Sequence, residues 1–386
     1  MNAASVLRTV LDHGPVARSR IAALSGLSPA AVSRQVVGLL ALGLLGERPE
    51  LAGAGSVGRP QLPVDIDTER LAVAGVHVGA PYSTLSLLDL RGNLLVQEVL
   101  DHRGLTGRPV LDRLLARIPG FLAEVPGGRQ VFGLGAITGG TVDPERGVTV
   151  RHEPLGWYEV PLGRLLERAS GLPVRVDNHA RALAQAEILF GRPAARRSLV
   201  QLFVGHVVDV ALAVGGRVHL GPQGATGEVA HLRVPGGTAD CPCGRRGCFA
   251  AAASDTTLYR DAVTAGVIAA PERAEMIAAV RAGDARADRL VLRRARLIGQ
   301  AVALLVDVVN PDVVVLTETF AVLDERYLDA VRAEVLHHSH LGGGPELVVT
   351  PRCGRDALAV AAGAAVLGEL FRSPLSCLGR PAPAVT

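Results

Sequence analysis

The chain has 386 residues, of which 48% are hydrophobic and 20% are charged, and its formal net charge is +3. This composition is typical of a globular protein with two or three domains. It contains no lysine, which excludes a phosphate-loop lysine, a Schiff base and a lysine general base. No apolar run reaches the roughly eighteen residues of a membrane span, and no signal peptide is recognisable, so we expect a cytoplasmic protein with no membrane segment.

The positive charge is concentrated at the N-terminus. Residues 1–60 carry six arginines against three acids, a net charge of +3 that accounts for the whole surplus. Hydrophobic periodicity predicts three helices here, over about 3–12, 18–24 and 29–43, with tight turns between them. A short second helix, a glycine turn and an amphipathic third helix are typical of a winged helix-turn-helix.

The third helix is the best defined of the three. Ser28 is a good N-cap and Pro29 a good first helical residue. An apolar stripe follows at helical spacing, formed by Val32, Val36, Leu39 and Leu40. Since this stripe must pack against the other helices, the opposite side is free to meet a partner.

That opposite side carries Ser33, Arg34 and Gln35, whose side chains can reach base edges and phosphates. The segment 47–61 has the composition of a wing, and its Arg59 would lie near the DNA backbone or in the minor groove. We therefore predict DNA contacts by Ser33, Arg34, Gln35 and Arg59. A helical hairpin with ordinary surface arginines is the alternative.

A linker-like stretch over 60–65 ends this module, and the composition then becomes β-rich. We predict a DNA-binding domain over 1–65 and a second domain over 66–386.

In the second domain, strands alternate with long helices, which indicates an α/β fold. Similar β-hairpins begin near Leu71 and Ser198, so we expect two lobes with a ligand cleft between them, one over about 70–185 with a C-terminal helix and one over about 186–355.

Four metal-binding side chains lie within eighteen residues: His231, Cys241, Cys243 and Cys248. Three thiols and an imidazole make one tetrahedral zinc site, and a site filled by four protein ligands leaves no open position for catalysis. The spacing therefore predicts a structural Zn²⁺. A disulfide or unused thiols are the alternatives, and a disulfide would require an oxidising compartment.

The chain resembles the ROK family of repressors and sugar kinases, which have an actin-like ATPase fold. The resemblance rests on the winged helix, the cysteine cluster with His231 and three further motifs: residues 156–162, 176–180 and 227–231. It implies a zinc site beside a sugar site. It also implies that Asn178, Glu228 and His231 contact sugar hydroxyls.

Departures from the kinase pattern affect the catalytic base first. Where kinases of the family have an aspartate after the asparagine, this chain has His179, and a sugar hydroxyl then lacks the carboxylate that would accept its proton. Ala250 replaces a glutamate that would hold hydroxyls. Both departures weaken the case for catalysis and for binding of an ordinary sugar.

The nucleotide side also departs from the kinase pattern. Ala80 and Pro81 stand in the first phosphate turn, where glycine and backbone donors are expected. Asp209 stands in the second phosphate turn and would repel phosphate, and Thr317-Glu318 replaces glycines of the adenosine region. These losses together argue against kinase activity.

We therefore predict a DNA-binding transcriptional regulator, a repressor of carbohydrate-related genes, with a degenerate, non-catalytic sugar-kinase-like effector domain. Its partners would be a double-stranded DNA operator, a sugar-like small-molecule effector and a second copy, in a homodimer or homotetramer. The alternatives are an ATP-dependent sugar kinase and a protein-interaction sensor that uses the degenerate cleft.

Overall fold

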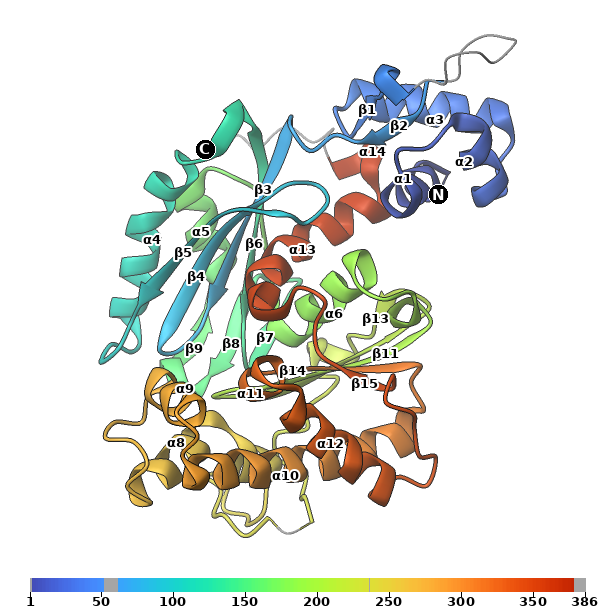
Figure 1. Ribbon diagram of the computed structural model, residues 1–386. Coiled ribbons are helices and arrows are strands. Elements are labelled where there is room, and N and C mark those ends of the chain that lie inside the picture. Colours follow the sequence, from blue (N-terminus) through green and yellow to red (C-terminus); the bar gives the residue numbers. More distant parts are fainter. Residues whose placement is uncertain (1, 52–61, 236, 378–386) are drawn as a thin grey trace. The chain divides into compact units, whose positions relative to one another are not determined.

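The computed structural model describes residues 2–51, 62–235 and 237–377. The chain divides into two compact units (Figure 1). The first unit comprises Met1–Ile137, Pro161–Val176 and Ala362–Thr386, and the second comprises Thr138–Val160 and Asp177–Ala361. The N-terminal module thus groups with the first unit, while residues 138–160 and 177–185 group with the second.

The N-terminal module is a winged helix-turn-helix. It contains α1 (Asn2–His13), α2 (Arg18–Ser25) and α3 (Pro29–Ala41), followed by the antiparallel pair β1 (Leu45–Glu47) and β2 (Val64–Ile66). Ser28 caps α3 as expected, because its Oγ accepts a hydrogen bond from the Ala31 N–H at 3.3 Å. The helix ends earlier than predicted, since Gly43 adopts the left-handed conformation that ends helices (φ +69°).

The body of the first unit is built on a five-stranded sheet with the order β10-β6-β3-β4-β5. The bounds of these strands in chain order are β3 Leu71–Val78, β4 Tyr82–Leu88, β5 Leu94–Asp101, β6 Gln130–Thr138 and β10 Val174–Asn178. Its helices are α4 Arg108–Leu122, α5 Leu162–Ser170, α13 Ala357–Arg372 and α14 Pro374–Cys377. β3, β4 and β5 pair in antiparallel fashion, which confirms the β-hairpin predicted to begin near Leu71.

The second unit contains a matching five-stranded sheet with the order β13-β12-β11-β14-β15 and a small sheet with the order β7-β8-β9. The strands are β7 Thr141–Asp143, β8 Val148–His152, β9 Trp157–Val160, β11 Ser198–Val204, β12 Val208–Val214, β13 Arg217–Val218, β14 Val313–Glu318 and β15 Val348–Val349. The helices are α6 His179–Phe190, α7 Phe249–Ala253, α8 Asp255–Thr264, α9 Arg273–Arg281, α10 Ala285–Val309, α11 Thr319–Leu323 and α12 Glu325–His338.

Strand alternation explains the layers of the second unit. Successive side chains of a strand point to opposite faces, so Leu199 and Val313 pack with α6 while Val200 and Val314 pack with α10 and α12. Helices therefore cover both faces of this sheet, as expected of a sheet with parallel strand pairs. The repeated strand pattern in the two units confirms the predicted duplicated α/β fold. None of the helices in the described part of the chain is long and apolar enough to cross a bilayer.

Candidate functional site

The outward face of α3 is defined by burial. Val32, Val36 and Leu39 are fully buried, whereas Leu40 is only partly buried. On the opposite side Arg34 is exposed, while Ser33 and Gln35 are half-buried on its two flanks. Because consecutive helical residues are about 100° apart, Arg34 lies at the centre of the face and the other two at its edges. Arg59 lies outside the described residues.

An arginine of the β4–β5 turn attaches the helix-turn-helix to the rest of its unit. The Arg91 guanidinium donates a hydrogen bond to the Leu11 carbonyl of α1 at 3.2 Å and pairs with the Asp65 carboxylate of β2. Gly14 fits tightly against this pair, because a Cβ there would lie 2.4 Å from Asp65 Oδ1. Helix α3 thus belongs to a module that Arg91 holds at two points, the end of α1 and β2.

The four predicted metal ligands converge in the loop between β13 and α7. Their ligand atoms all lie within 4.8 Å of one another. Cys243 Sγ and Cys248 Sγ are 3.6 Å apart, and Cys241 Sγ lies 3.5 Å from His231 Nδ1. All five cysteines are free, so none of these thiols is used in a disulfide.

The geometry of this cluster fits a tetrahedral metal. Zinc–sulfur bonds of about 2.3 Å place tetrahedral sulfurs about 3.8 Å apart, close to the distance found between Cys243 and Cys248. Hydrogen bonds from Arg245 lower the pKa of the Cys243 thiol to about 6, which favours the thiolate that binds metal. Gly247 has φ +76°, and a Cβ there would lie 2.4 Å from the Gly237 carbonyl, so this turn requires glycine.

A polar cavity lies in the second unit, at the start of α6. It has a volume of about 290 Å³, part of which is open solvent, and is lined by Gly140, Thr141, Asn178, Arg181, Asp209, Val210, Gly224, Ala225, Thr226, Gly227 and Glu228. Asn178 and Glu228, two of the three predicted ligand contacts, therefore share one cavity. His231 is not among these lining residues and belongs to the metal cluster.

Asn178 both caps a helix and shapes the cavity. Its Oδ1 accepts a hydrogen bond from the Ala180 N–H at 2.8 Å, and its Nδ2 donates to the Gly140 carbonyl at 2.9 Å. Glu228 and Asp209 are the acidic residues that line the cavity. Burial and the charge of Asp209 raise the pKa of Glu228, partly offset by His231. Such a cavity, rich in acceptors and acids, suits a neutral ligand with several hydroxyl groups better than an anion.

His179, the residue at the family's catalytic-base position, is paired within the protein. Its Nε2 lies 2.7 Å from Asp209 Oδ2, and its ring contacts Phe203 with centroids 4.0 Å apart. Burial opposes ionisation of Asp209, but His179 and the hydrogen bonds of Gly140 and Asn178 outweigh it and lower the pKa of Asp209. The sequence analysis identified both departures separately and missed the pair. The signal available in the sequence was that His179 and Asp209 both depart from the kinase pattern.

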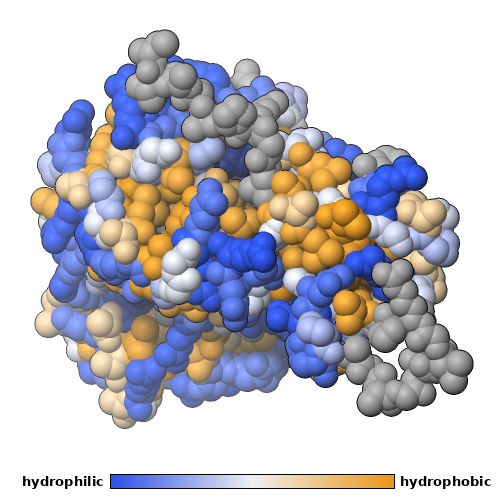
Figure 2. Space-filling view, turned by 90° about the horizontal axis from the view of Figure 1, so that it is seen from above, coloured by the Kyte–Doolittle hydropathy of each residue, from blue (hydrophilic) through white to orange (hydrophobic). Residues whose placement is uncertain are grey.

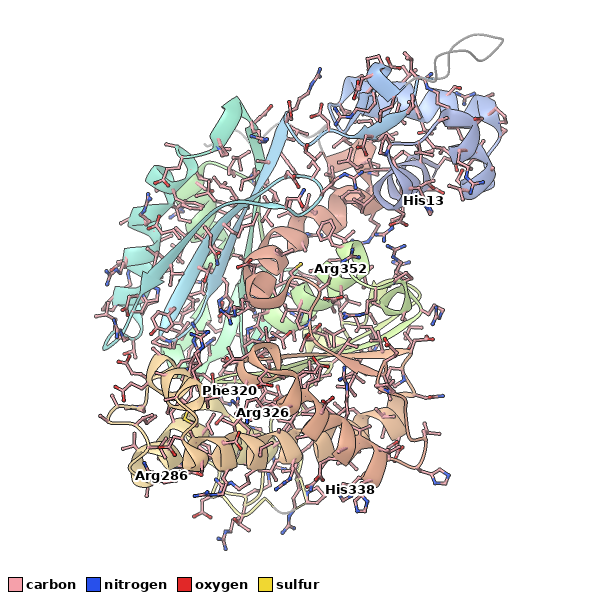
Figure 3. The ribbon with its side chains drawn as sticks, viewed as in Figure 1. His13, Arg286, Phe320, Arg326, His338 and Arg352 are labelled. Carbon is pink, nitrogen blue, oxygen red and sulfur yellow. The ribbon has the colours of Figure 1, made fainter. Side chains whose placement is uncertain are left out.

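A second buried ion network includes Glu318, which the resemblance assigns to the adenosine region. Arg294 of α10 donates to Glu318 at 2.8 Å and to Asp255 at 2.7 Å. Glu318 in turn accepts from the Phe320 and Ala321 N–H groups at 2.9 and 2.7 Å, so it is the N-cap of α11, the helix to which Phe320 belongs (Phe320 is labelled in Figure 3). The sequence analysis noticed Glu318 but missed Arg294, because an arginine in a long amphipathic helix is usually exposed.

Comparisons with known proteins agree with this arrangement. Residues 73–368 match the model of the ROK family. A transcriptional regulator of Mycobacterium tuberculosis is 35% identical over 398 residues, covering 98% of this chain and 87% of the relative. The DNA-binding transcriptional repressor Mlc of Escherichia coli is 26% identical, with 87% and 86% covered.

Solved structures support the same assignment. A ROK family transcriptional regulator described as a homologue of the Escherichia coli Mlc protein has a TM-score of 0.77 at 25% identity, covering 97% of this chain and 96% of that chain. A ROK hexokinase of Thermus thermophilus has a TM-score of 0.59 at 31% identity, covering 76% and 97%. From its sequence, its fold and these relatives, the chain belongs to the ROK family.

Proposed function

We propose that this protein is a DNA-binding transcriptional repressor whose ROK body binds an effector and performs no phosphoryl transfer. The observation that carries the proposal is the exposed Arg34 on a capped helix of a winged helix-turn-helix. Relatives named as regulators and repressors match almost the whole chain, the N-terminal module included. The regulated genes would be carbohydrate-related, as the names of xylose and N-acetylglucosamine repressors among the relatives suggest.

In this proposal α3 enters the major groove, with Arg34 reading a base or phosphate and Ser33 and Gln35 at its flanks. Arg59 would contact the DNA from the wing. One such helix reads only a few base pairs, so the protein would bind a two-fold symmetric operator as a homodimer or homotetramer. Transcription would be blocked while the operator is occupied.

The body would act as an effector domain. The cavity beside Asn178 and Glu228 would hold an uncharged sugar-like molecule, and the His231–cysteine cluster would hold a structural Zn²⁺. Two observations argue against a kinase. His179 is engaged by Asp209, and Glu318, which the resemblance assigns to the adenosine region, is engaged by Arg294.

The test is an electrophoretic shift and footprint of the protein on DNA upstream of its own gene. Arg34→Ala should weaken specific binding by about tenfold or more, because a bidentate arginine–base contact contributes roughly 1–3 kcal/mol. Arg260→Ala is the matched control, since Arg260 is an exposed arginine of α8 in the second unit. Undiminished binding by Arg34→Ala would exclude α3 as the recognition helix.

A further inference from the structure

Apart from Arg34, the exposed residues at the centre of the outward face of α3 are apolar. Its exposed residues are Ala30, Arg34, Val37 and Ala41, which recur at the spacing of one helical face. Val37 is the largest apolar side chain among them and is 59% exposed. The buried stripe of the same helix already supplies the contacts with the module's core, so the core does not explain why position 37 is a valine.

We propose that Val37 is a specificity-determining residue that reads a thymine in the operator through its C5-methyl group. The inference rests on the proposed function, because it takes α3 to be the recognition helix. A valine side chain has neither a donor nor an acceptor. In the major groove the C5-methyl of thymine is the largest apolar group on any base edge, and apolar side chains are found in contact with it.

The neighbours of Val37 favour DNA over a protein partner. Arg34 lies one turn before Val37 on the same face, at the position from which an arginine reaches guanine or phosphate. Ala30 and Ala41 at the two ends are small enough to let the helix backbone approach the base pairs. The module's net charge of +3 over residues 1–60 matches a polyanion.

Among residues 2–51, 62–235 and 237–377, none buries Val37. Gly38 follows Val37, and a Cβ at Gly38 would lie 3.8 Å from Leu375 of α14, so the C-terminal helix borders the flank of α3. Val37 stays exposed beside it. In the space-filling view, hydrophobic residues lie among hydrophilic ones at the right of the picture, the side on which α1 to α3 are drawn (Figure 2).

The experiment removes the thymine C5-methyl group from the DNA and the Val37 side chain from the protein, first separately and then together. Operators selected from a random DNA pool are prepared with each thymine replaced in turn by deoxyuridine, which differs only in lacking the C5-methyl. For the wild-type protein, replacement at one position of each half-site should weaken binding about three- to fivefold. Val37→Ala should bind operators with thymine or deoxyuridine at that position with equal affinity.

Two controls isolate the effect. Val99→Ala changes an equally exposed valine of β5 (57%) outside the DNA-binding module and should keep the wild-type preference for thymine. Val37→Ala should unfold at the wild-type temperature, because the side chain it truncates is exposed. Arg34→Ala should weaken binding to both forms of the operator.

Three results would overturn the inference. Deoxyuridine could have no effect at any position, or its effect could be the same in wild type and Val37→Ala. In either case the proposed function survives if Arg34→Ala still weakens operator binding. A wild-type protein that selects no DNA sequence would refute the proposed function, and the inference with it.

Discussion

His152 illustrates how a single buried side chain makes the fold depend on pH. It ends β8 and is buried, and its Nδ1 accepts a hydrogen bond from the Leu155 N–H at 3.2 Å. Burial lowers its pKa to about 4, and the nearby His179 adds to this shift, while Asp209 opposes it. The ring is therefore neutral in the folded protein, and a proton on Nδ1 would remove the acceptor that Leu155 needs.

The pH dependence follows from the sign of this shift. The ordinary pKa of histidine is 6.5, so between pH 6.5 and 4 the unfolded chain binds the proton and the folded chain does not. The contribution of His152 is complete above pH 6.5 and is lost as the pH falls towards 4, by about 3 kcal/mol in total. Urea unfolding at a series of pH values measures this loss.

His152→Asn is the informative variant for that measurement. The asparagine Oδ1 can accept the Leu155 N–H bond but cannot be protonated in this range. Other groups, Asp209 and His206 among them, titrate in both proteins, so the quantity to compare is the difference between the two stability curves. The wild type should lose stability relative to the variant as the pH falls from 6.5 to 4. Parallel curves would show that His152 is not the group responsible.

The Arg294–Glu318 pair joins several elements of the second unit. Arg294 lies in the middle of α10, and its side chain is only 4% exposed. It also donates to the Ala253 carbonyl at the end of α7 at 2.6 Å. Burial raises the pKa of Glu318, and the charge of Arg294 opposes this shift. In a buried ion pair each charge is compensated by the other, so removing one member leaves the other charge buried without compensation.

Glu318→Ala should therefore lower the free energy of unfolding by about 3–5 kcal/mol. The change removes the ion pair with Arg294 and also the cap on the Phe320 and Ala321 N–H groups. Chemical denaturation monitored by circular dichroism measures the loss. Asp312→Ala is the control, because it breaks the exposed pair with Arg197, and such a pair contributes less than about 1 kcal/mol. An equal loss of unfolding free energy in Glu318→Ala and Asp312→Ala would show that burial of the Arg294–Glu318 pair does not increase its contribution.

Local patterns predicted the elements well where caps and periodicity agree. Among the long helices expected in the second domain, α10 begins after the Asp284 cap and ends before Asn310, which has a left-handed conformation. The sheet β7–β9 was not anticipated beyond one motif, because its strands of three to five residues are too short for a clear periodicity. Short strands take their structure from partners elsewhere in the chain.

Pairing between distant residues was the main limit on predicting the sites. The metal cluster was predictable because its four ligands lie within a short segment and share an unusual chemistry. Asp209 and His179 are thirty residues apart, on β12 and α6, and each has an ordinary interpretation alone. Arg294 is likewise unremarkable until the fold places it between Asp255 and Glu318.

At the scale of the whole chain, the cluster of His231 and three cysteines lies in a long segment with little regular structure. The segment from β13 to α7 contributes Val229, Val234 and Phe249 to the core cluster of the second unit. Few backbone hydrogen bonds of regular strands or α-helices hold these residues in position. The described residues between β13 and α7 form isolated bridges, a short 3-10 helix and turn hydrogen bonds. We infer that the metal fixes the segment and, with it, that part of the core.

Zinc removal should consequently destabilise the second unit. Purified protein should contain one zinc per chain by elemental analysis. Cys248→Ser should lose the metal and unfold at a temperature lower by about 5 °C or more, since roughly 1 kcal/mol corresponds to 2–4 °C in a domain of this size. Cys353→Ser, which changes a cysteine outside the cluster, should keep both metal and stability.

The same variants test whether the body controls the DNA-binding module. The DNA-binding module belongs to the first unit and the His231–cysteine cluster to the second. Loss of metal therefore changes no residue that packs within α1 to α3. If the state of the body sets operator affinity, Cys248→Ser should bind the operator several-fold more weakly than Cys353→Ser at a temperature where both are folded. Metal-free protein with unchanged stability and operator affinity would refute both the structural role of zinc and this coupling.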